Sequence, residues 1–320
     1  MWRRVFATMT HAPSRDGRVG QGGAGGPVGP VGRVGLVGLG LVGTALGTRL
    51  LSAGHSVLCH DRDGAALEAF VQQGGRPAGS VEEIGRRCAC VVLAVYDSAG
   101  VLDLVEGQDG LLAGGATRAI IDCSTGDPEA LHLLSERLAA HGVDFIEAPL
   151  SGSSRQIAAG QATMLLGATP DALARHMAVL DALSPQHVHV GGAGMGARAK
   201  LATNLVLGLN RAALAEGMVF AERLGIAPEN FLALVLATPA RSEAAQAKGA
   251  MMVRGEFDPP QSRIRQHLKD VHLMLEQART AGQGLPLSTA HAALLQSAVE
   301  AGDGELDNAA IIRQLRREIS

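Results

Sequence analysis

Hydrophobic and polar positions alternate along the first half of the chain in the manner of a β/α protein. Short apolar runs predict buried strands at 34–37, 57–59, 90–95, 119–123, 143–148, 163–167 and 187–190. Stretches with apolar residues at helical spacing predict helices at 44–53, 65–72, 81–87 with Ser80 as N-cap, and 128–140. This order predicts an α/β fold with a doubly wound, Rossmann-type sheet, in which ligands bind beyond the carboxyl ends of the strands.

The second half of the chain changes character near Gly191–Gly196, where the strand pattern stops. A helix is predicted over 200–224, with Leu201, Leu205 and Leu209 on its apolar stripe and a length of about 37 Å. Further helices are predicted at 228–236, 241–253, 262–281, 288–301 and 308–318. We therefore expect a dinucleotide-binding domain at 34–193 and an all-α domain at 194–320, joined by a long interdomain helix.

Residues 1–33 stand apart from both halves. Positions 18–33 are mostly Gly, Pro and Val without periodicity, which is typical of a disordered tail. The first fifteen residues carry Arg3, Arg4 and Arg15 and no acidic residue before position 16, a faint similarity to a transit peptide, and Met9 is an alternative start. We expect this tail to lie outside the fold.

Composition and charge narrow the classes of function. Apolar residues make up 47% of the 320, enough for a large core, and a net charge of −3 without a basic stripe argues against nucleic acid as a partner. No apolar run reaches the ~18 residues of a membrane helix, so no membrane association is expected. The four cysteines lack a C-x-x-C pair, which favours a reduced cytoplasmic protein, and His187 and His189 lack a third ligand, so no metal is expected.

A glycine-rich turn follows the first predicted strand. Gly38 permits a tight turn, Gly40 lets a pyrophosphate approach the backbone, and Gly43 lets the following helix pack closely on the strand. Asp61 follows the second predicted strand, where the fingerprint has an acidic residue. The same G-x-G-x-x-G spacing at 20–25 has neither strand nor helix beside it, so the structural context carries the prediction of a dinucleotide site. The predicted turn reads Gly38-Leu39-Gly40-Leu41-Val42-Gly43.

Two further groups of residues are candidates for chemistry. Lys200 and Asn204 share a helix face, and a lysine desolvated between domains has a lowered pKa suited to acid–base catalysis; a solvated lysine near a helix start is the alternative. Ser151-Gly152-Ser153 ends a strand with hydroxyl and N–H groups that suit a carboxylate, although the same residues suit an ordinary turn. The spacing alone leaves both choices open.

Five motifs in order and spacing resemble the β-hydroxyacid dehydrogenases, which include 3-hydroxyisobutyrate dehydrogenase and tartronate semialdehyde (2-hydroxy-3-oxopropionate) reductase and are similar to 6-phosphogluconate dehydrogenase. The resemblance runs from residue 34 to about 312. Its motifs are Gly38–Gly43, Asp122-Cys123-Ser124-Thr125, Ala148–Ser153, Gly194–Asn204 and Lys269-Asp270.

The resemblance implies hydride transfer between NAD or NADP and a short 3-hydroxy acid or semialdehyde. It implies that Lys200 is the general acid or base, that Asn204 orients substrate and lysine, and that Ser151, Gly152 and Ser153 hold the carboxylate. It also implies a homodimer or homotetramer. The cofactor contacts that it implies beyond the fingerprint are Thr125, Lys269 and the segment Val95-Tyr96 over the adenosine side.

The chain departs from the family pattern at three places. Many members have Gly at Ser153, Leu-Pro at Val95-Tyr96 and a second asparagine at Thr203. These differences bear on the carboxylate pocket and on the adenosine side of the cofactor site.

The choice between NAD and NADP rests on two adjacent residues. The Asp61 carboxylate can accept hydrogen bonds from the adenosine ribose and repels a 2′-phosphate, whereas Arg62 can pair with that phosphate. Because the arginine can swing into solvent, we expect a modest preference for NAD with NADP tolerated. A non-catalytic dinucleotide-binding module and an imine reductase-like enzyme are alternatives, and Lys200 favours the dehydrogenase over both.

Overall fold

The structure is a computed structural model that describes residues 32–317. The similarity to a transit peptide and the alternative start at Met9 fall outside the described residues, as does the predicted disordered tail over 1–33 except for its last two residues. Of these, Arg33 begins the first strand of the sheet, so the predicted boundary of the tail is too late. None of the helices within 32–317 combines the length and apolar character that crossing a bilayer requires.

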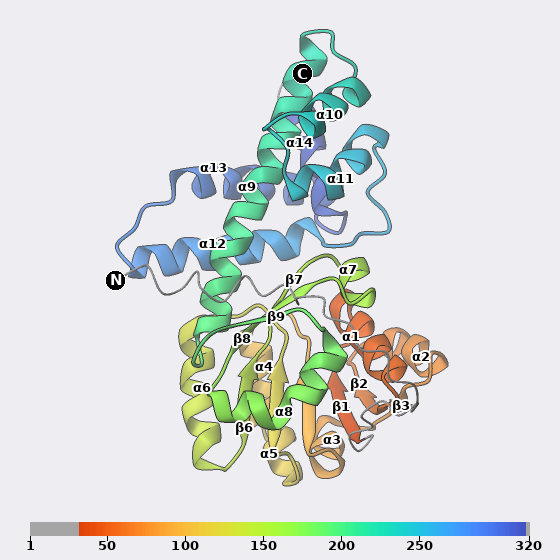
Figure 1. The fold of residues 1–320 in the computed structure, drawn as a ribbon, viewed down its shortest axis with the longest axis vertical. Helices are drawn as coiled ribbons and strands as arrows, with labels where there is room; N and C mark the ends of the chain where they lie inside the picture. The colour runs from red at the N-terminus through yellow and green to blue at the C-terminus, as the bar shows by residue number, and fades with distance from the viewer. Residues whose placement is uncertain (1–31, 318–320) are drawn as a thin grey trace, which may run out of the picture. The chain divides into compact units, whose positions relative to one another are not determined.

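One sheet forms the N-terminal domain, and its strands run in the order β3-β2-β1-β4-β5-β6-β8-β7, with β9 beside β8 (Figure 1). β3 through β6 are parallel, whereas β8 runs antiparallel to β6 and β7. The order reverses between β1 and β4, which is the switch point where ligands bind in doubly wound sheets. The strands are β1 Arg33–Val37, β2 Ser56–His60, β3 Arg76–Pro77, β4 Cys90–Leu93, β5 Ala119–Asp122, β6 Asp144–Glu147, β7 Leu150–Ser151, β8 Thr163–Gly167 and β9 His187–Gly191.

Helices cover both faces of this sheet, which explains the continuous apolar runs of its strands. Consecutive residues point to opposite faces: Leu36 packs with Leu46 and Leu50 of α1, whereas Val37 packs with Ile84 of α3 in a separate cluster. The helices are α1 Leu41–Ser52, α2 Gly64–Gln72, α3 Val81–Arg87, α4 Ser98–Glu106, α5 Leu111–Gly114, α6 Pro128–Ala140, α7 Ser154–Ala158 and α8 Pro170–Leu183.

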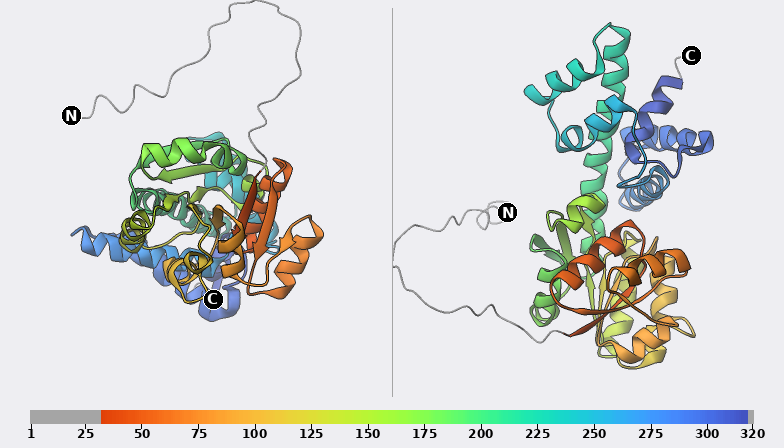
Figure 2. Two further views of the ribbon diagram at one scale, coloured as in Figure 1. Left: turned by 90° about the horizontal axis from the view of Figure 1, so that it is seen from below. Right: turned by 90° about the vertical axis from the view of Figure 1, so that its right-hand side faces the viewer.

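The C-terminal domain is helical and is built around α9, Met195–Arg223, whose 29 residues span about 43 Å. Figures 1 and 2 show α9 leaving the sheet and running among the remaining helices. A separate apolar cluster that includes Met218, Leu268 and Leu295 forms the core of this domain. The other elements are α10 Pro228–Ala237, α11 Glu243–Arg254, α12 Ile264–Thr280, α13 Pro286–Ala298, a π-helical turn Val299–Asp303, a 3₁₀ turn Asn308–Ala310 and α14 Ile311–Arg317.

The predicted α/β fold followed by helices is confirmed, and the differences lie at element boundaries and in short elements. The predicted strand 90–95 ends at Leu93, and the helix predicted from residue 44 begins at Leu41, because Gly40 is already its N-cap. α9 begins five residues before the predicted start. The elements α4, α5, α7, α8, β3 and β7 were not predicted, although the Thr169 side chain caps α8 by accepting the N–H of Ala172 at 3.3 Å.

Candidate active site

The glycine turn after β1 has the geometry of a phosphate-binding loop. Gly38 has φ +92°, and its N–H donates to the carbonyl oxygen of His60 at 3.0 Å. A Cβ at Gly38 would collide with the carbonyl oxygen of Ala94, and one at Gly43 would collide with the carbonyl oxygen of Gly38. At Gly40 a Cβ would meet nothing within 4 Å. The outer two glycines are therefore required by the protein itself, and the middle one borders open space.

The N-terminus of α1 offers free backbone donors beside Gly40. Gly40 is the N-cap and provides no side-chain acceptor, and no acidic residue lies in the first turn. The first N–H groups of a helix lack intrahelical partners and carry partial positive charge, so they suit a pyrophosphate. A cleft of about 810 Å³ runs between this turn and the connection from α11 to α12, and its lining includes Leu39, Gly40 and, opposite, Gln261. The chain therefore provides the donor set and the room that a dinucleotide needs.

Asp61, which is predicted to contact the adenosine ribose, also binds the backbone of the protein. Its Oδ2 accepts the N–H of Leu39 at 2.5 Å and its Oδ1 accepts the N–H of Asp63 at 2.8 Å, so it braces the glycine turn. Arg62 beside it is exposed and forms no ion pair within residues 32–317. The negative charge of Asp61 stays at the end of β2, but both of its oxygens already accept backbone hydrogen bonds.

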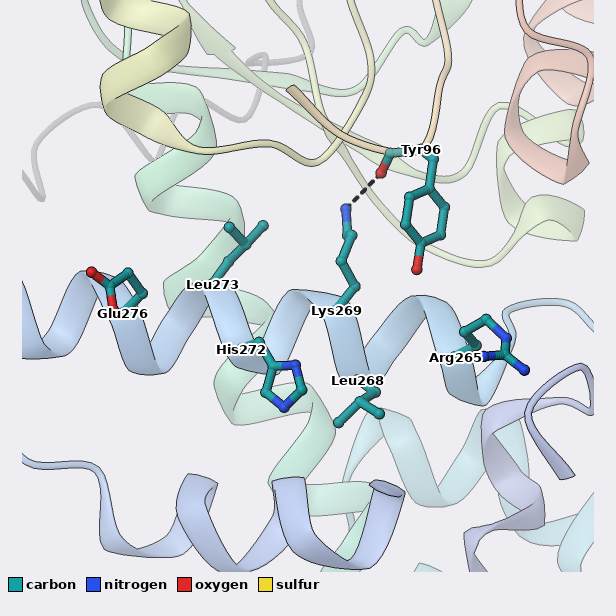
Figure 3. A pocket seen from close by; sticks show the side chains of 7 residues that line it. All are labelled: Tyr96, Arg265, Leu268, Lys269, His272, Leu273 and Glu276. Carbon is teal, nitrogen blue, oxygen red and sulfur yellow. Dashed lines mark hydrogen bonds between the residues drawn. The ribbon is translucent and has the colours of Figure 1, made fainter. Parts of the chain in front are cut away.

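Lys269 of α12 reaches the carboxyl ends of β4 and β5. Its Nζ donates to the carbonyl oxygens of Tyr96 at 2.7 Å and Thr125 at 2.5 Å, lies 3.2 Å from Asp270 Oδ1 and sits 5.2 Å from the centre of the Tyr96 ring. Figure 3 shows the side chain pointing from α12 toward Tyr96 at the wall of a cavity of about 600 Å³. Lys269 thus joins the helical domain to the strand ends. The N–H of Val95, in the same segment as Tyr96, donates to Ser124 Oγ at 3.0 Å.

Lys200 and Asn204 are brought together with Asp270 in the interior. Lys200 is 8% exposed, and its Nζ donates to the carbonyl oxygen of Leu150 at 2.5 Å. Burial lowers the pKa of Lys200 to about 8; nearby Asp270 opposes this shift and Lys269 adds to it. Asn204 Nδ2 donates to Asp270 Oδ2 at 3.2 Å. An amine that is partly neutral at neutral pH can both accept and donate a proton, as acid–base catalysis requires.

Glu147, which the sequence analysis missed, fixes the start of α9. This buried side chain at the end of β6 accepts the N–H groups of Gly194 at 2.5 Å and of Gly196 and Ala197 at 3.2 Å each. Burial raises its pKa to about 7, and the charge of Asp122 adds to the shift. Because a carboxylate is stabilised at a helix N-terminus, Glu147 holds the helix that carries Lys200 against the sheet.

One residue of the segment after β6 caps a helix. The Ser153 hydroxyl accepts the N–H of Gln156 at 3.3 Å, and the Gln156 side chain accepts the N–H of Ser153 at 2.8 Å, which forms a capping box for α7. Ser151 is half-buried on β7, and its hydroxyl has no hydrogen-bond partner within 32–317. Gly152 has φ +154° and packs against Ala162. Ser151 and Gly152 are thus the members of this segment whose polar groups are not used in capping α7.

The rarity of lysine in the sequence could have pointed to the buried lysines of the site. The chain has 28 Lys and Arg residues, of which only Lys200, Lys248 and Lys269 are lysines. Lys200 and Lys248 are buried, and the Lys269 side chain is 15% exposed. All three lysines of the chain therefore lie at buried or nearly buried positions. No comparable signal marks Glu147, because its partners lie 47 to 50 residues away.

Two family models cover the part of the chain that forms this site. The NAD binding domain of 6-phosphogluconate dehydrogenase matches residues 33–192, and the NAD-binding domain of NADP-dependent 3-hydroxyisobutyrate dehydrogenase matches residues 194–315. The two matches meet where β9 gives way to α9.

Relatives of known name support the same assignment. The chain is 28% identical to 2-(hydroxymethyl)glutarate dehydrogenase of Eubacterium barkeri, over 86% of this chain and 91% of that protein. It is 29% identical to L-threonate dehydrogenase of Cupriavidus necator, over 86% and 93%. The crystal structure of 3-hydroxyisobutyrate dehydrogenase from Salmonella typhimurium superposes with a TM-score of 0.79 at 26% identity, over 88% and 99%. The chain belongs to the β-hydroxyacid dehydrogenase family of NAD(P)-dependent oxidoreductases.

Proposed function

We propose that the protein interconverts a short 3-hydroxy acid and the corresponding semialdehyde or keto acid, with Lys200 as the acid–base group. The observation that carries this proposal is a buried lysine of lowered pKa, set beside Asn204 and tied to the strand-end segment at Leu150. When bound, NAD or NADP supplies or accepts the hydride. The residues of the chain provide the proton transfer and the positioning.

Lys200 would handle the proton that accompanies the hydride. In the oxidation of an alcohol, the neutral amine of Lys200 accepts the hydroxyl proton while the hydride leaves the carbon that bears this hydroxyl. In the reduction, the ammonium returns that proton to the carbonyl oxygen. A pKa near the working pH suits both directions, because each form is well populated.

Positioning would come from residues on both domains. The Asn204 amide donates to Asp270 and thus has a fixed orientation beside Lys200, and its carbonyl oxygen is available to a substrate hydroxyl. Ser151 and Gly152 offer donors for the substrate carboxylate, while the Ser153 hydroxyl remains engaged with Gln156. This assignment narrows the carboxylate site to two of the three residues first expected.

The substrate class rests on the family and on its named members. Relatives named for 2-(hydroxymethyl)glutarate and L-threonate act on hydroxy acids, and a neighbour in structure is a 3-hydroxyisobutyrate dehydrogenase. For this chain we propose a 3-hydroxyisobutyrate dehydrogenase or tartronate semialdehyde reductase type of reaction. Residues 34–193 would bind the cofactor, and residues 194–320 would complete the substrate pocket.

We propose NAD as the modestly preferred cofactor. The Asp61 charge lies at the end of β2, where a 2′-phosphate would be repelled, and its hydrogen bonds to Leu39 and Asp63 keep it there. Arg62 is exposed and would allow NADP to bind as well. The four cysteines are free, which supports the proposed cytoplasmic location.

A homodimer or homotetramer is part of the proposal. Phe220 and Leu224 at the far end of α9 and Leu234 on α10 are 64%, 62% and 54% exposed, which is unusual for large apolar side chains. Sedimentation equilibrium tests it, and a monomer at every concentration would contradict it.

The decisive experiment is a substrate panel with NAD and with NADP. The panel contains 3-hydroxyisobutyrate, glycerate, tartronate semialdehyde, succinic semialdehyde and threonate, with a cyclic imine added for comparison, and the readout is reduced cofactor absorbance. We expect turnover of at least one compound by the wild-type protein and its loss in Lys200→Ala. Cofactor binding without any turnover would favour the non-catalytic module, and reduction of a cyclic imine alone would favour the imine reductase.

A further inference from the structure

A buried arginine whose side chain lacks a hydrogen-bonded carboxylate within residues 32–317 lies on the same face of α9 as the catalytic candidates. Arg211 is 4% exposed, and its Nε and Nη2 have no hydrogen-bond partner within residues 32–317. Burial lowers the pKa of Arg211 to about 10 and the charge of Asp307 opposes this shift, so the guanidinium still carries its charge at neutral pH. A buried charge that lacks a partner is costly, and such a group in a native protein calls for an anion.

Two histidines from neighbouring helices face the same region. His267 of α12 and His291 of α13 have ring centres 5.2 Å apart, both are buried, and the Nε2 of each lacks a partner within the described part of the chain. A Cβ at Gly208 would lie 2.5 Å from His267 Nε2 and 3.2 Å from His291 Cε1. Gly208 therefore lets both rings approach α9. We refer to Arg211, His267 and His291 as the basic cluster.

The carboxylates near the basic cluster are already committed to other partners. Asp307 accepts Lys248 Nζ at 2.8 Å and the N–H groups of Gln261 and Ala309. Asp270 pairs with Asn204 and Lys269. Asp307 thus faces two cations, Lys248 through direct hydrogen bonds and Arg211 through its charge, which leaves one positive charge in excess. Burial and the charge of Arg211 lower the pKa values of both histidines, to about 4 for His291, so they add neutral N–H donors and no charge.

The basic cluster adjoins the proposed catalytic residues along two helices. On α9, Gly208 follows Asn204 by about 6 Å and Arg211 by about 10.5 Å along the axis. Long helical side chains tend to point back toward the helix N-terminus, which agrees with the effect of the Arg211 charge on the two histidines beside Gly208. On α12, His267 precedes Asp270 by three residues, which puts it one turn along the same face as the partner of Asn204.

We propose that the basic cluster receives a second anionic group of the substrate, at the end opposite the carboxylate held by Ser151 and Gly152. The substrate class is then a 3-hydroxy acid with a carboxylate or phosphate at its far end, about four to six carbons long. The guanidinium fork matches either anion, and the histidine N–H groups complete its coordination. This inference rests on the proposed function, since Lys200 and Asn204 define where the hydroxyl-bearing carbon lies.

The test compares matched diacids and monoacids. Steady-state kcat/KM is measured for 3-hydroxyadipate against 3-hydroxyhexanoate and for 3-hydroxyglutarate against 3-hydroxypentanoate. 3-Hydroxy-4-phosphobutyrate distinguishes a phosphate from a carboxylate. We expect the wild-type protein to prefer one of the dianions over its monoanionic partner by about 10- to 100-fold, as one charge-assisted contact allows. Equal rates for every pair would overturn the proposal while leaving the dehydrogenase assignment intact.

Variants then locate the preference. Arg211→Met keeps an unbranched apolar stem and removes the charge, and we expect it to abolish the preference for the dianion while changing monoacid rates little. Arg211→Lys should retain part of the preference. Arg279→Met, at an exposed arginine of α12 paired with Glu276, is the control and should behave as wild type. If Arg211→Met folds and keeps the preference, the basic cluster has only a structural role.

A binding measurement separates this inference from the proposed function. Isothermal titration of the NAD-loaded wild-type protein with adipate and with hexanoate does not depend on turnover. Tighter binding of adipate that is lost in Arg211→Met would support the subsite even if no hydroxy acid reacted. Equal affinity for adipate and hexanoate in the wild-type protein would overturn it, whatever the fate of the dehydrogenase assignment.

Discussion

Replacing Lys200 by alanine removes a single amine from the interior of the protein. In the native protein this amine donates to the carbonyl oxygen of Leu150, and its charge lies near those of Asp270 and Lys269. Loss of a general acid or base typically lowers a rate by ~10²–10⁴-fold. Because the residues that form the glycine turn are distant in sequence and unaltered, cofactor binding should remain.

The shifted pKa gives this prediction a pH dependence. With a pKa of about 8, roughly one lysine in ten is neutral at pH 7, against about three in ten thousand at the ordinary value of 10.5. Burial thus raises the population of the base by about 300-fold at pH 7. Oxidation needs the neutral amine, so its kcat/KM should rise with pH and level off above about 8. Reduction needs the ammonium, so its kcat/KM should fall above the same pH.

The assay measures both directions from about pH 6 to about pH 10 for the wild-type protein and Lys200→Ala. Arg198→Ala is the matched control, because Arg198 lies two residues earlier on α9 with a side chain 45% exposed. Cofactor affinity follows from nicotinamide fluorescence. Small primary amines added to Lys200→Ala should restore part of the rate, which separates a missing base from a damaged fold.

Three results would refute the reasoning about Lys200. One is a Lys200→Ala variant that keeps more than about a tenth of the wild-type rate. The second is a wild-type oxidation profile that still rises toward pH 10, which would mean that burial does not lower the pKa. The third is an Arg198→Ala variant that loses as much activity as Lys200→Ala, since the loss would then come from disturbance of α9.

Three further predictions concern the cofactor site and the buried carboxylates. Gly40→Ala should melt like the wild-type protein but bind NAD at least about tenfold more weakly, whereas Gly43→Ala should lose several degrees of melting temperature; equal effects would show that the open space at Gly40 is not a phosphate site. Asp61→Asn should shift the kcat/KM ratio toward NADP by about tenfold, and Arg62→Ala should shift it toward NAD; an unchanged ratio in both would remove these residues from cofactor choice. Burial raises the pKa of Asp122 from 3.8 to about 6, so the folded protein binds this proton more tightly than the unfolded chain does. The stability gained from this proton is lost as the pH rises through about 6, where the buried carboxyl ionises. Asp122→Asn should therefore stabilise the protein by about 2–3 kcal/mol at pH 8 and by little at about pH 4 in urea unfolding, and a gain that is the same at both pH values would contradict this.

Local patterns explain why so much of the fold follows from the sequence. The buried strands appear as uninterrupted apolar runs because helices cover both faces of the sheet, and Ser80 and Asp127 cap α3 and α6 through bonds to residues two or three positions later. The glycine turn is likewise local, since Gly38 and Gly43 are five residues apart. Features of this kind depend on neighbours in the chain, which periodicity and capping rules describe.

The parts of the site that the sequence did not reveal depend on partners far along the chain. Glu147 ends a strand like many acidic residues, and only the fold shows that it meets the N-terminus of α9. Asp61 and Ser153 are predicted as ligand contacts, and the fold adds that their oxygens also accept backbone N–H groups within the protein. A polar side chain at a strand end can serve the backbone or a ligand equally well, and geometry decides between them.

The contacts that position Lys200 all join a helix of the C-terminal domain to a group on a strand or at a strand end of the sheet. Glu147 is anchored in β6 and holds the N–H groups at the start of α9, Lys200 itself meets the carbonyl oxygen of Leu150, and Lys269 meets those of Tyr96 and Thr125. Backbone carbonyl oxygens do not change when a side chain is substituted, so sequence change at strand ends other than Glu147 can alter the pocket without releasing the helices. Because an error of about 1 Å in the placement of a catalytic group can lower a rate about 100-fold, these cross-domain contacts are as necessary to the proposed reaction as the amine of Lys200.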